Sequence, residues 1–118
     1  MRFIALALAI LAVTPAHAKN HYRHHRAHYH GRLPWCGLYM MQLTGDHRSG
    51  LALARNWARE GTNAGGPGTG VIVVWSHHVG RIEGRDERGR WIVRSGNDGN
   101  AVRVRPRSLA GAIAFRRV

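Results

Sequence analysis

The hydrophobic pattern of this 118-residue chain changes from helical to strand-like only once, near Val71. Before that point, residues 35–43 form a mostly apolar segment, and residues 51–59 carry apolar side chains four positions apart. Both segments end close to a glycine, which is typical of helix ends. After it comes VIVVW (71–75), a short and wholly apolar run that indicates a buried central strand. Two helices followed by several strands predict an α+β domain with helices packed on a small antiparallel sheet.

Four further strands are predicted, over residues 78–84, 91–95, 101–105 and 112–116. In the third of these, Val102 and Val104 alternate with arginines, so we expect both valines to point inward. The last is a closing strand that carries Ile113 and Phe115. The glycine-rich segment before the first strand, GTNAGGPGTG (61–70), leads into a strand rather than a helix. We interpret it as a connection, because a phosphate-binding loop needs a following helix N-terminus.

The first 18 residues have the three parts of a secretory signal peptide. Arg2 supplies the positive charge, residues 3–13 the apolar stretch, and Ala16-His17-Ala18 the small-residue cleavage site. The apolar stretch is well short of the roughly 20 residues that a membrane-spanning helix needs. We therefore expect cleavage, a periplasmic or secreted product, and no stable membrane span afterwards.

Residues 19–32 read KNHYRHHRAHYHGR and contain no large aliphatic side chain, so they predict a solvated linker before a domain at 33–118. Helical spacing within this linker would place four imidazoles on one face, where zinc, copper or nickel could bind. The four are His21, His24, His25 and His28. The alternative is a basic tether that gains charge at mildly acidic pH. We expect no cofactor in the folded domain.

The chain is strongly basic, with 18 Lys and Arg against 6 Asp and Glu and a formal net charge of +12. For an exported protein, this charge favours peptidoglycan or another anionic cell-envelope polymer as the partner. A candidate basic stripe consists of Arg103, Arg105, Arg107, Arg116 and Arg117. The alternative is an ordinary solvated basic face. Nucleic acid is disfavoured, because export separates the chain from it and no recognition helix is evident.

Cys36 is the single cysteine, so it cannot form a disulfide within the chain. It lies in the first turn of the first predicted helix, where unpaired backbone N–H groups and the helix dipole should lower the pKa of its thiol. This position suits a nucleophile. The alternative is a small buried core residue.

The hairpin formed by residues 78–84 and 91–95 supplies two more polar groups. A four-residue loop at 86–89 places His78 opposite Asn97, and a two-residue loop leaves them diagonal neighbours. In both registers they share a face with Ile82 and Val93, which we expect to look toward the helices. A thiolate, an imidazole and a carboxamide are the parts of a cysteine hydrolase.

Several neighbours compete for these roles. His77 could be the base instead of His78, but adjacent strand residues point to opposite faces, and His78 shares the parity of Ile82. Asp98 is a second candidate for the group that orients the imidazole. Glu83 has the opposite parity and is expected to be a solvated charge.

Five short motifs, in order, resemble the CHAP and NlpC-like cysteine peptidases over residues 33–118. They are WCGLY at 35–39, LARNW with Gly61 at 53–57, GVIVVW at 70–75, HVG at 78–80 and SGN at 95–97. The resemblance implies a papain-like fold and hydrolysis of amide bonds in peptidoglycan, as an amidase or endopeptidase. It also implies that Cys36 is the nucleophile, His78 the general base and acid, and Asn97 the third polar residue.

The chain departs from that family pattern at three positions. Val71 replaces a common Asp, Gly37 replaces an alanine, and Arg81 replaces an apolar or aromatic residue. None of these changes removes a catalytic atom. They leave open a catalytically inactive wall-binding module of the same fold, and the histidine segment leaves open an exported metal- or polyanion-binding protein.

Overall fold

The computed structural model describes residues 34–118, so the predicted signal peptide and the histidine-rich linker lie outside the described residues. One α-helix and two 3₁₀ helices precede all six strands. The helices are α1 (Cys36–Thr44), η1 (Ser49–Ala52) and η2 (Ala54–Arg59). The strands are β1 (Thr62–Asn63), β2 (Ile72–Val74), β3 (Val79–Arg85), β4 (Trp91–Ser95), β5 (Arg103–Pro106) and β6 (Ala114–Arg117).

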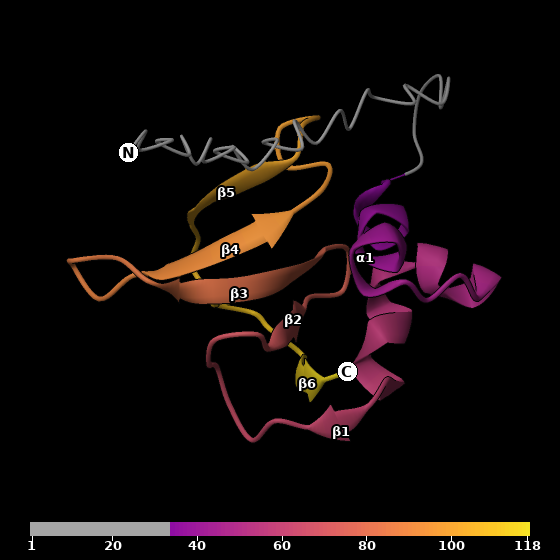
Figure 1. The fold of residues 1–118 in the computed structure, drawn as a ribbon, viewed down its shortest axis with the longest axis horizontal. Helices are drawn as coiled ribbons and strands as arrows, with labels where there is room; N and C mark the ends of the chain where they lie inside the picture. The colour runs from indigo at the N-terminus through magenta and orange to yellow at the C-terminus, as the bar shows by residue number, and fades with distance from the viewer. Residues whose placement is uncertain (1–33) are drawn as a thin grey trace, which may run out of the picture. The chain divides into compact units, whose positions relative to one another are not determined.

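All strands pair antiparallel, in the order β1-β6-β2-β3-β4-β5 (Figure 1). The predicted α+β class with an antiparallel sheet is therefore confirmed. Strand β2 lies between β6 and β3, and all three of its residues are buried. The wholly apolar run thus forms an interior strand, as its composition predicts.

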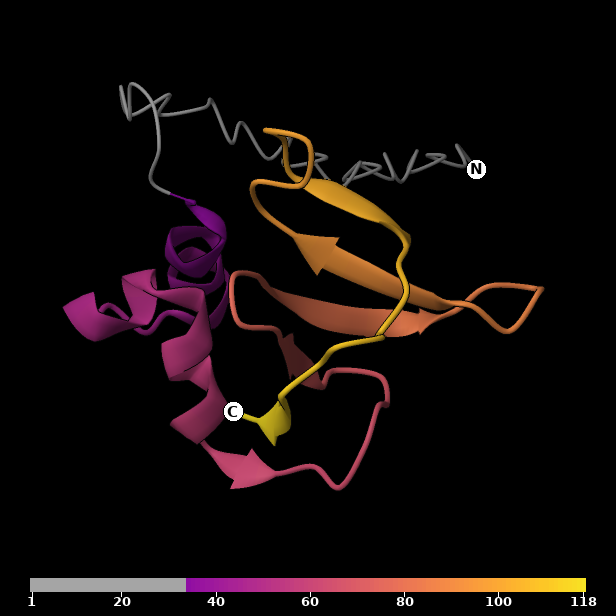
Figure 2. The same ribbon diagram turned by 180° about the vertical axis from the view of Figure 1, so that it is seen from behind.

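The helices cover one face of the sheet, and a separate apolar cluster lies on the other (Figures 1 and 2). The helix-side cluster joins α1 and η2 to Val74 and Val79. Ile82 and Val93 belong to the second cluster, together with Val73. The expectation that Ile82 and Val93 face the helices is therefore wrong: Val79, of opposite parity, is the β3 residue that packs there.

Helix α1 ends at Gly45, which adopts a left-handed conformation (φ 75°) and donates its N–H to the Met41 carbonyl at 2.9 Å. The second predicted helix is instead split into η1 and η2 by Leu53, whose backbone is extended and whose side chain is 52% exposed. The buried residues Leu51, Ala54 and Trp57 are three apart, which matches the period of a 3₁₀ helix.

The β3–β4 hairpin has the register expected for a four-residue loop near its middle, where Ile82 pairs with Val93. A bulge at Glu83 then shifts the pairing, so that Gly84 meets Ile92. Glu83 is half-buried and binds Arg81 and Arg94 at 2.9 and 2.8 Å. It is therefore an ion-pairing residue rather than the expected solvated charge.

The predicted inward orientation of Val102 and Val104 is wrong, because both side chains are exposed. Strand β5 lies at the edge of the sheet, and neither apolar cluster extends over it. Ile113 is also exposed, just before β6, whereas Phe115 packs against the second cluster. The alternation of valine and arginine therefore predicted the strand, but it did not predict which face of that strand is covered by the rest of the domain.

Across residues 34–118, no helix has both the length and the apolar character needed to cross a membrane.

Candidate active site

Cys36 is the first residue of α1 and packs against the start of β3 (Figure 1). Its thiol donates to the backbone carbonyl of His77 at 3.9 Å, and Val79 belongs to the same apolar cluster. The fold thus brings the cysteine to the strand end that carries the two histidines, about 40 positions further along the chain. The thiol has no exposed surface (0%).

Burial raises the pKa of the Cys36 thiol above its ordinary value of 9.0. The backbone groups of Val79 and Gly37 and the charge of Arg107 lower it, but by less than burial raises it. The expected lowering of this pKa is therefore wrong, because loss of water outweighs the helix terminus. At neutral pH the resting thiol is protonated.

His78 is buried, and its Nε2 lies 2.9 Å from the Ser95 hydroxyl. Ser95 is the last residue of β4 and is fully buried. The ring of Trp75 packs at a tilt beside the imidazole, with 5.7 Å between centroids. Because Ser95 engages Nε2, the nitrogen of the ring that remains available is Nδ1.

Burial, together with the charge of Arg107, lowers the pKa of His78 from 6.5 to about 4, and the carboxylate of Asp98 opposes this change. The imidazole is therefore neutral at pH 7. His77, by contrast, is exposed and meets Cys36 only through its backbone carbonyl. Between the two histidines, the structure gives His78 the enclosed and oriented side chain.

Asn97 lies beyond the end of β4, in a turn where its φ is 52° and Asp98 N–H donates to the Ala101 carbonyl at 2.9 Å. The hydrogen bond made by the His78 ring goes to Ser95 and not to Asn97. The structure therefore brings the Cys36 thiol to the backbone of His77, at the start of β3. Among the described residues it records no hydrogen bond between that thiol and the His78 ring, whose partner Ser95 shares the Val93 face of the sheet, away from the helices. Asn97 lies in the adjoining turn.

Ser95 was not among the predicted site residues, although the strand register contains the signal that identifies it. Extending the Ile82–Val93 register places Ser95 opposite Gly80, on the same face as His78. Gly80 has no side chain to separate them, and a Cβ there would lie 3.1 Å from the Ser95 Cβ. A hydroxyl diagonal to a histidine across a glycine is within hydrogen-bonding reach.

Asp98 is nearly enclosed (4% exposed) and binds two arginines. Arg105 contacts both carboxylate oxygens, with Nε 2.8 Å from Oδ2, and Arg107 Nη1 lies 3.5 Å from Oδ1. Although burial raises the pKa of Asp98, the bond to Arg105 and the two positive charges hold it below its ordinary value. Asp98 acts on His78 through its charge rather than as a hydrogen-bond partner.

Within residues 34–118, no group of three or more His, Cys, Asp or Glu side chains is arranged to hold a metal ion. The predicted metal-binding histidines, His21, His24, His25 and His28, lie outside the described residues.

The chain matches no known protein family, no curated protein and no solved structure with which it was compared.

Proposed function

We propose that this protein is an exported cysteine hydrolase of papain-like fold that cleaves amide bonds in peptidoglycan. One observation carries the proposal: the thiol at the start of α1 packs against the strand end that bears His78, whose ring is fixed by Ser95 at 2.9 Å. The order of the five motifs supports the same reading. The substrate class comes from the family resemblance and from the basic charge of the chain.

In this mechanism, Cys36 is the nucleophile and His78 acts through Nδ1. Because thiol and imidazole are both neutral at rest, the proton passes from sulfur to the ring as the C–S bond forms. Backbone N–H groups at the start of α1 stabilise the oxyanion. His78 then gives the proton to the leaving amine, and a water activated by the same ring hydrolyses the thioester.

We assign the orientation of the imidazole to Ser95 rather than to Asn97, on the basis of the Nε2 contact. The resemblance assigns that role to Asn97, and the two assignments are tested separately below. Because Cys36 is fully enclosed, substrate must displace the side chains that cover it before the sulfur can attack.

The decisive experiment digests purified sacculi with the wild-type protein and with Cys36→Ala. We expect new amine or carboxyl ends, identified by mass spectrometry, from the wild type and none from the variant. Thermal unfolding of both proteins controls for loss of fold. An equal rate of release from the folded variant would rule out Cys36 as the nucleophile, and the identity of the new ends distinguishes amidase from endopeptidase.

A second candidate, a wall-binding module without turnover, is favoured by the enclosed thiol and its raised pKa. It predicts that the wild type co-sediments with sacculi yet releases no new ends. A third candidate assigns the function to the histidine segment. Deleting residues 19–32 should then abolish binding of metal or polyanion, whereas the hydrolase proposal predicts that sacculus digestion persists.

A further inference from the structure

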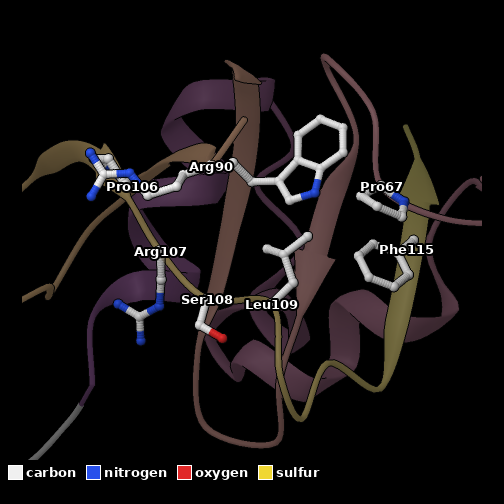
Figure 3. Close-up of a pocket in the computed structure, with 8 residues that line it drawn as sticks. Pro67, Arg90, Pro106, Arg107, Ser108, Leu109 and Phe115 are labelled. Carbon is white, nitrogen blue, oxygen red and sulfur yellow. The ribbon is translucent and has the colours of Figure 1, made fainter. Parts of the chain in front are cut away.

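A groove of about 640 Å³ lies on the side of the sheet away from the helices (Figure 3). Its walls are mainly apolar, and several of them belong to the second apolar cluster. The residues that line it are Pro67, Arg90, Trp91, Pro106, Arg107, Ser108, Leu109 and Phe115. Figure 3 shows Pro67 and Phe115 at one end, with the head groups of Arg90 and Arg107 toward the other.

The two arginines differ in how their charge is matched. Arg90 has its own carboxylate, because its Nε lies 2.7 Å from Asp86. Arg107 shares Asp98 with Arg105, and Arg105 makes the shorter, two-pronged contact. Two guanidinium groups therefore face one carboxylate, and the excess positive charge is at Arg107, which remains partly exposed.

Arg107 also connects the groove to the candidate active site. Its guanidinium carbon lies 5.0 Å from the centre of the Trp75 ring, and that ring packs beside His78. A ligand bound to Arg107 would therefore lie two side chains away from the imidazole. Binding in the groove does not itself require the thiol.

We propose that this groove binds an amphipathic carboxylate, an apolar chain or ring that carries one free carboxylate. The apolar part would lie between Trp91, Leu109 and Phe115, and the carboxylate would pair with Arg107. A planar guanidinium with unmatched charge, at the end of an apolar groove, is complementary to such a ligand in both shape and charge.

The test uses the full mature chain labelled with ¹⁵N, titrated with N-acetyl-L-leucine, N-acetyl-L-phenylalanine and their carboxamides. The four tryptophans provide separate indole signals, and Trp57 is an internal reference because it is buried on the helix side and bonded to Leu51 at 2.8 Å. We expect the carboxylates to shift the Trp91 signal but not that of Trp57. The carboxamides should bind about tenfold more weakly, because they lack the charge.

Arg107→Gln should weaken carboxylate binding by about tenfold and leave carboxamide binding unchanged. The matched control is Arg88→Gln, an exposed arginine in the hairpin turn for which the structure records no ion pair. Leu109→Ser tests the apolar side independently and should weaken both kinds of ligand. Equal affinity for carboxylate and carboxamide, an unmoved Trp91 signal, or unchanged binding in both Arg107→Gln and Leu109→Ser would overturn the inference.

The same titration with Cys36→Ala distinguishes this inference from the proposed function. Groove binding should persist in that variant even if sacculus digestion is lost. If wild-type protein digests no sacculi but still binds the carboxylates, the hydrolase proposal fails and the groove assignment stands.

Discussion

Burial determines the chemistry of the individual residues at the candidate site. It keeps the Cys36 thiol protonated and the His78 imidazole neutral, although a helix terminus on its own would favour a thiolate. The remaining requirement is that the imidazole ring be held in one orientation. Ser95 holds it, since its hydroxyl is the hydrogen-bond partner of the His78 ring.

Removing that hydroxyl with Ser95→Ala should lower kcat for sacculus digestion by roughly tenfold to a hundredfold, with KM nearly unchanged. The reason is that a lost hydrogen bond to a buried group is worth about 1–3 kcal/mol. Stopped digestion time courses measure the rate, and urea unfolding measures stability. Ser49→Ala, a change at an exposed serine outside the site and the groove, is the matched control.

The variant that tests whether Asn97 orients the His78 ring is Asn97→Gly, because glycine accepts the positive φ at that position. If Ser95 orients the ring, this variant should retain most of the activity. A large loss in Asn97→Gly alongside normal activity in Ser95→Ala would return the orienting role to Asn97.

At the scale of elements, the start of α1 is fixed by a close approach of backbone. A Cβ on Gly37 would lie 2.3 Å from the Ala52 carbonyl oxygen and 2.5 Å from that of Leu51. By helix propensity alone, glycine at position 37 would weaken the helix by about 1 kcal/mol relative to alanine. In the folded chain, η1 crosses the helix where only glycine fits.

Gly37→Ala should therefore destabilise the protein by about 1–3 kcal/mol despite the better helix propensity of alanine, because the clash is with backbone. Chemical denaturation measures the free energy of unfolding. Gly50→Ala is the control, since the nearest atom to its Cβ would be the Asn56 side-chain nitrogen at an ordinary 3.8 Å. Equal stability of the two variants would show that η1 can move away from α1.

Elements with strong local patterns could be predicted from the sequence, and elements decided by neighbours could not. The helix ending at Gly45 and the buried strand β2 follow from glycine and from β-branched composition. The split at Leu53 depends on which side chains the sheet covers, and helical periodicity does not contain that information. The bulge at Glu83 likewise depends on its pairing with two arginines across strands.

The candidate site shows the same division. Cys36 and His78 could be selected from residue type, and the fold brings the Cys36 thiol to the backbone carbonyl of His77, the neighbour of His78. Strand parity did not predict which face His78 shares, because Ile82 faces away from the helices. The raised pKa of the thiol and the role of Ser95 could not be predicted from the sequence, because each depends on how tightly the helix packs onto the strands. The loss of water around these groups arises only when the helices have packed onto the sheet.

At the scale of the whole molecule, the buried neutral imidazole makes stability depend on pH. The pKa of His78 is about 4 in the folded protein and 6.5 ordinarily, so the unfolded chain binds the proton more readily. This contribution to stability is fully present above pH 6.5 and is lost as the pH falls toward 4. We expect the Tm to fall by several degrees between pH 7 and pH 4.5.

His78→Gln should remove much of that decrease, whereas His77→Gln, a change at an exposed position, should leave it intact. Thermal unfolding at pH 7, 5.5 and 4.5 makes the comparison. The lowered pKa of Asp98 also stabilises the fold, and this contribution is present above the ordinary value of 3.8 and is lost below it. Because both variants and the wild type retain Asp98, it does not change the comparison between them. An equally steep decrease in wild type and His78→Gln would contradict the assignment.

Strand β6 is the last element in the chain, yet it lies inside the sheet, between β1 and β2. A ribosome-bound intermediate that ends before Ala114 therefore lacks the strand that joins those two. The sheet can therefore close only after synthesis has passed Arg117, because β6 pairs with both β1 and β2. Protection from protease should accordingly appear abruptly, not gradually, as stalled chains are lengthened through this strand.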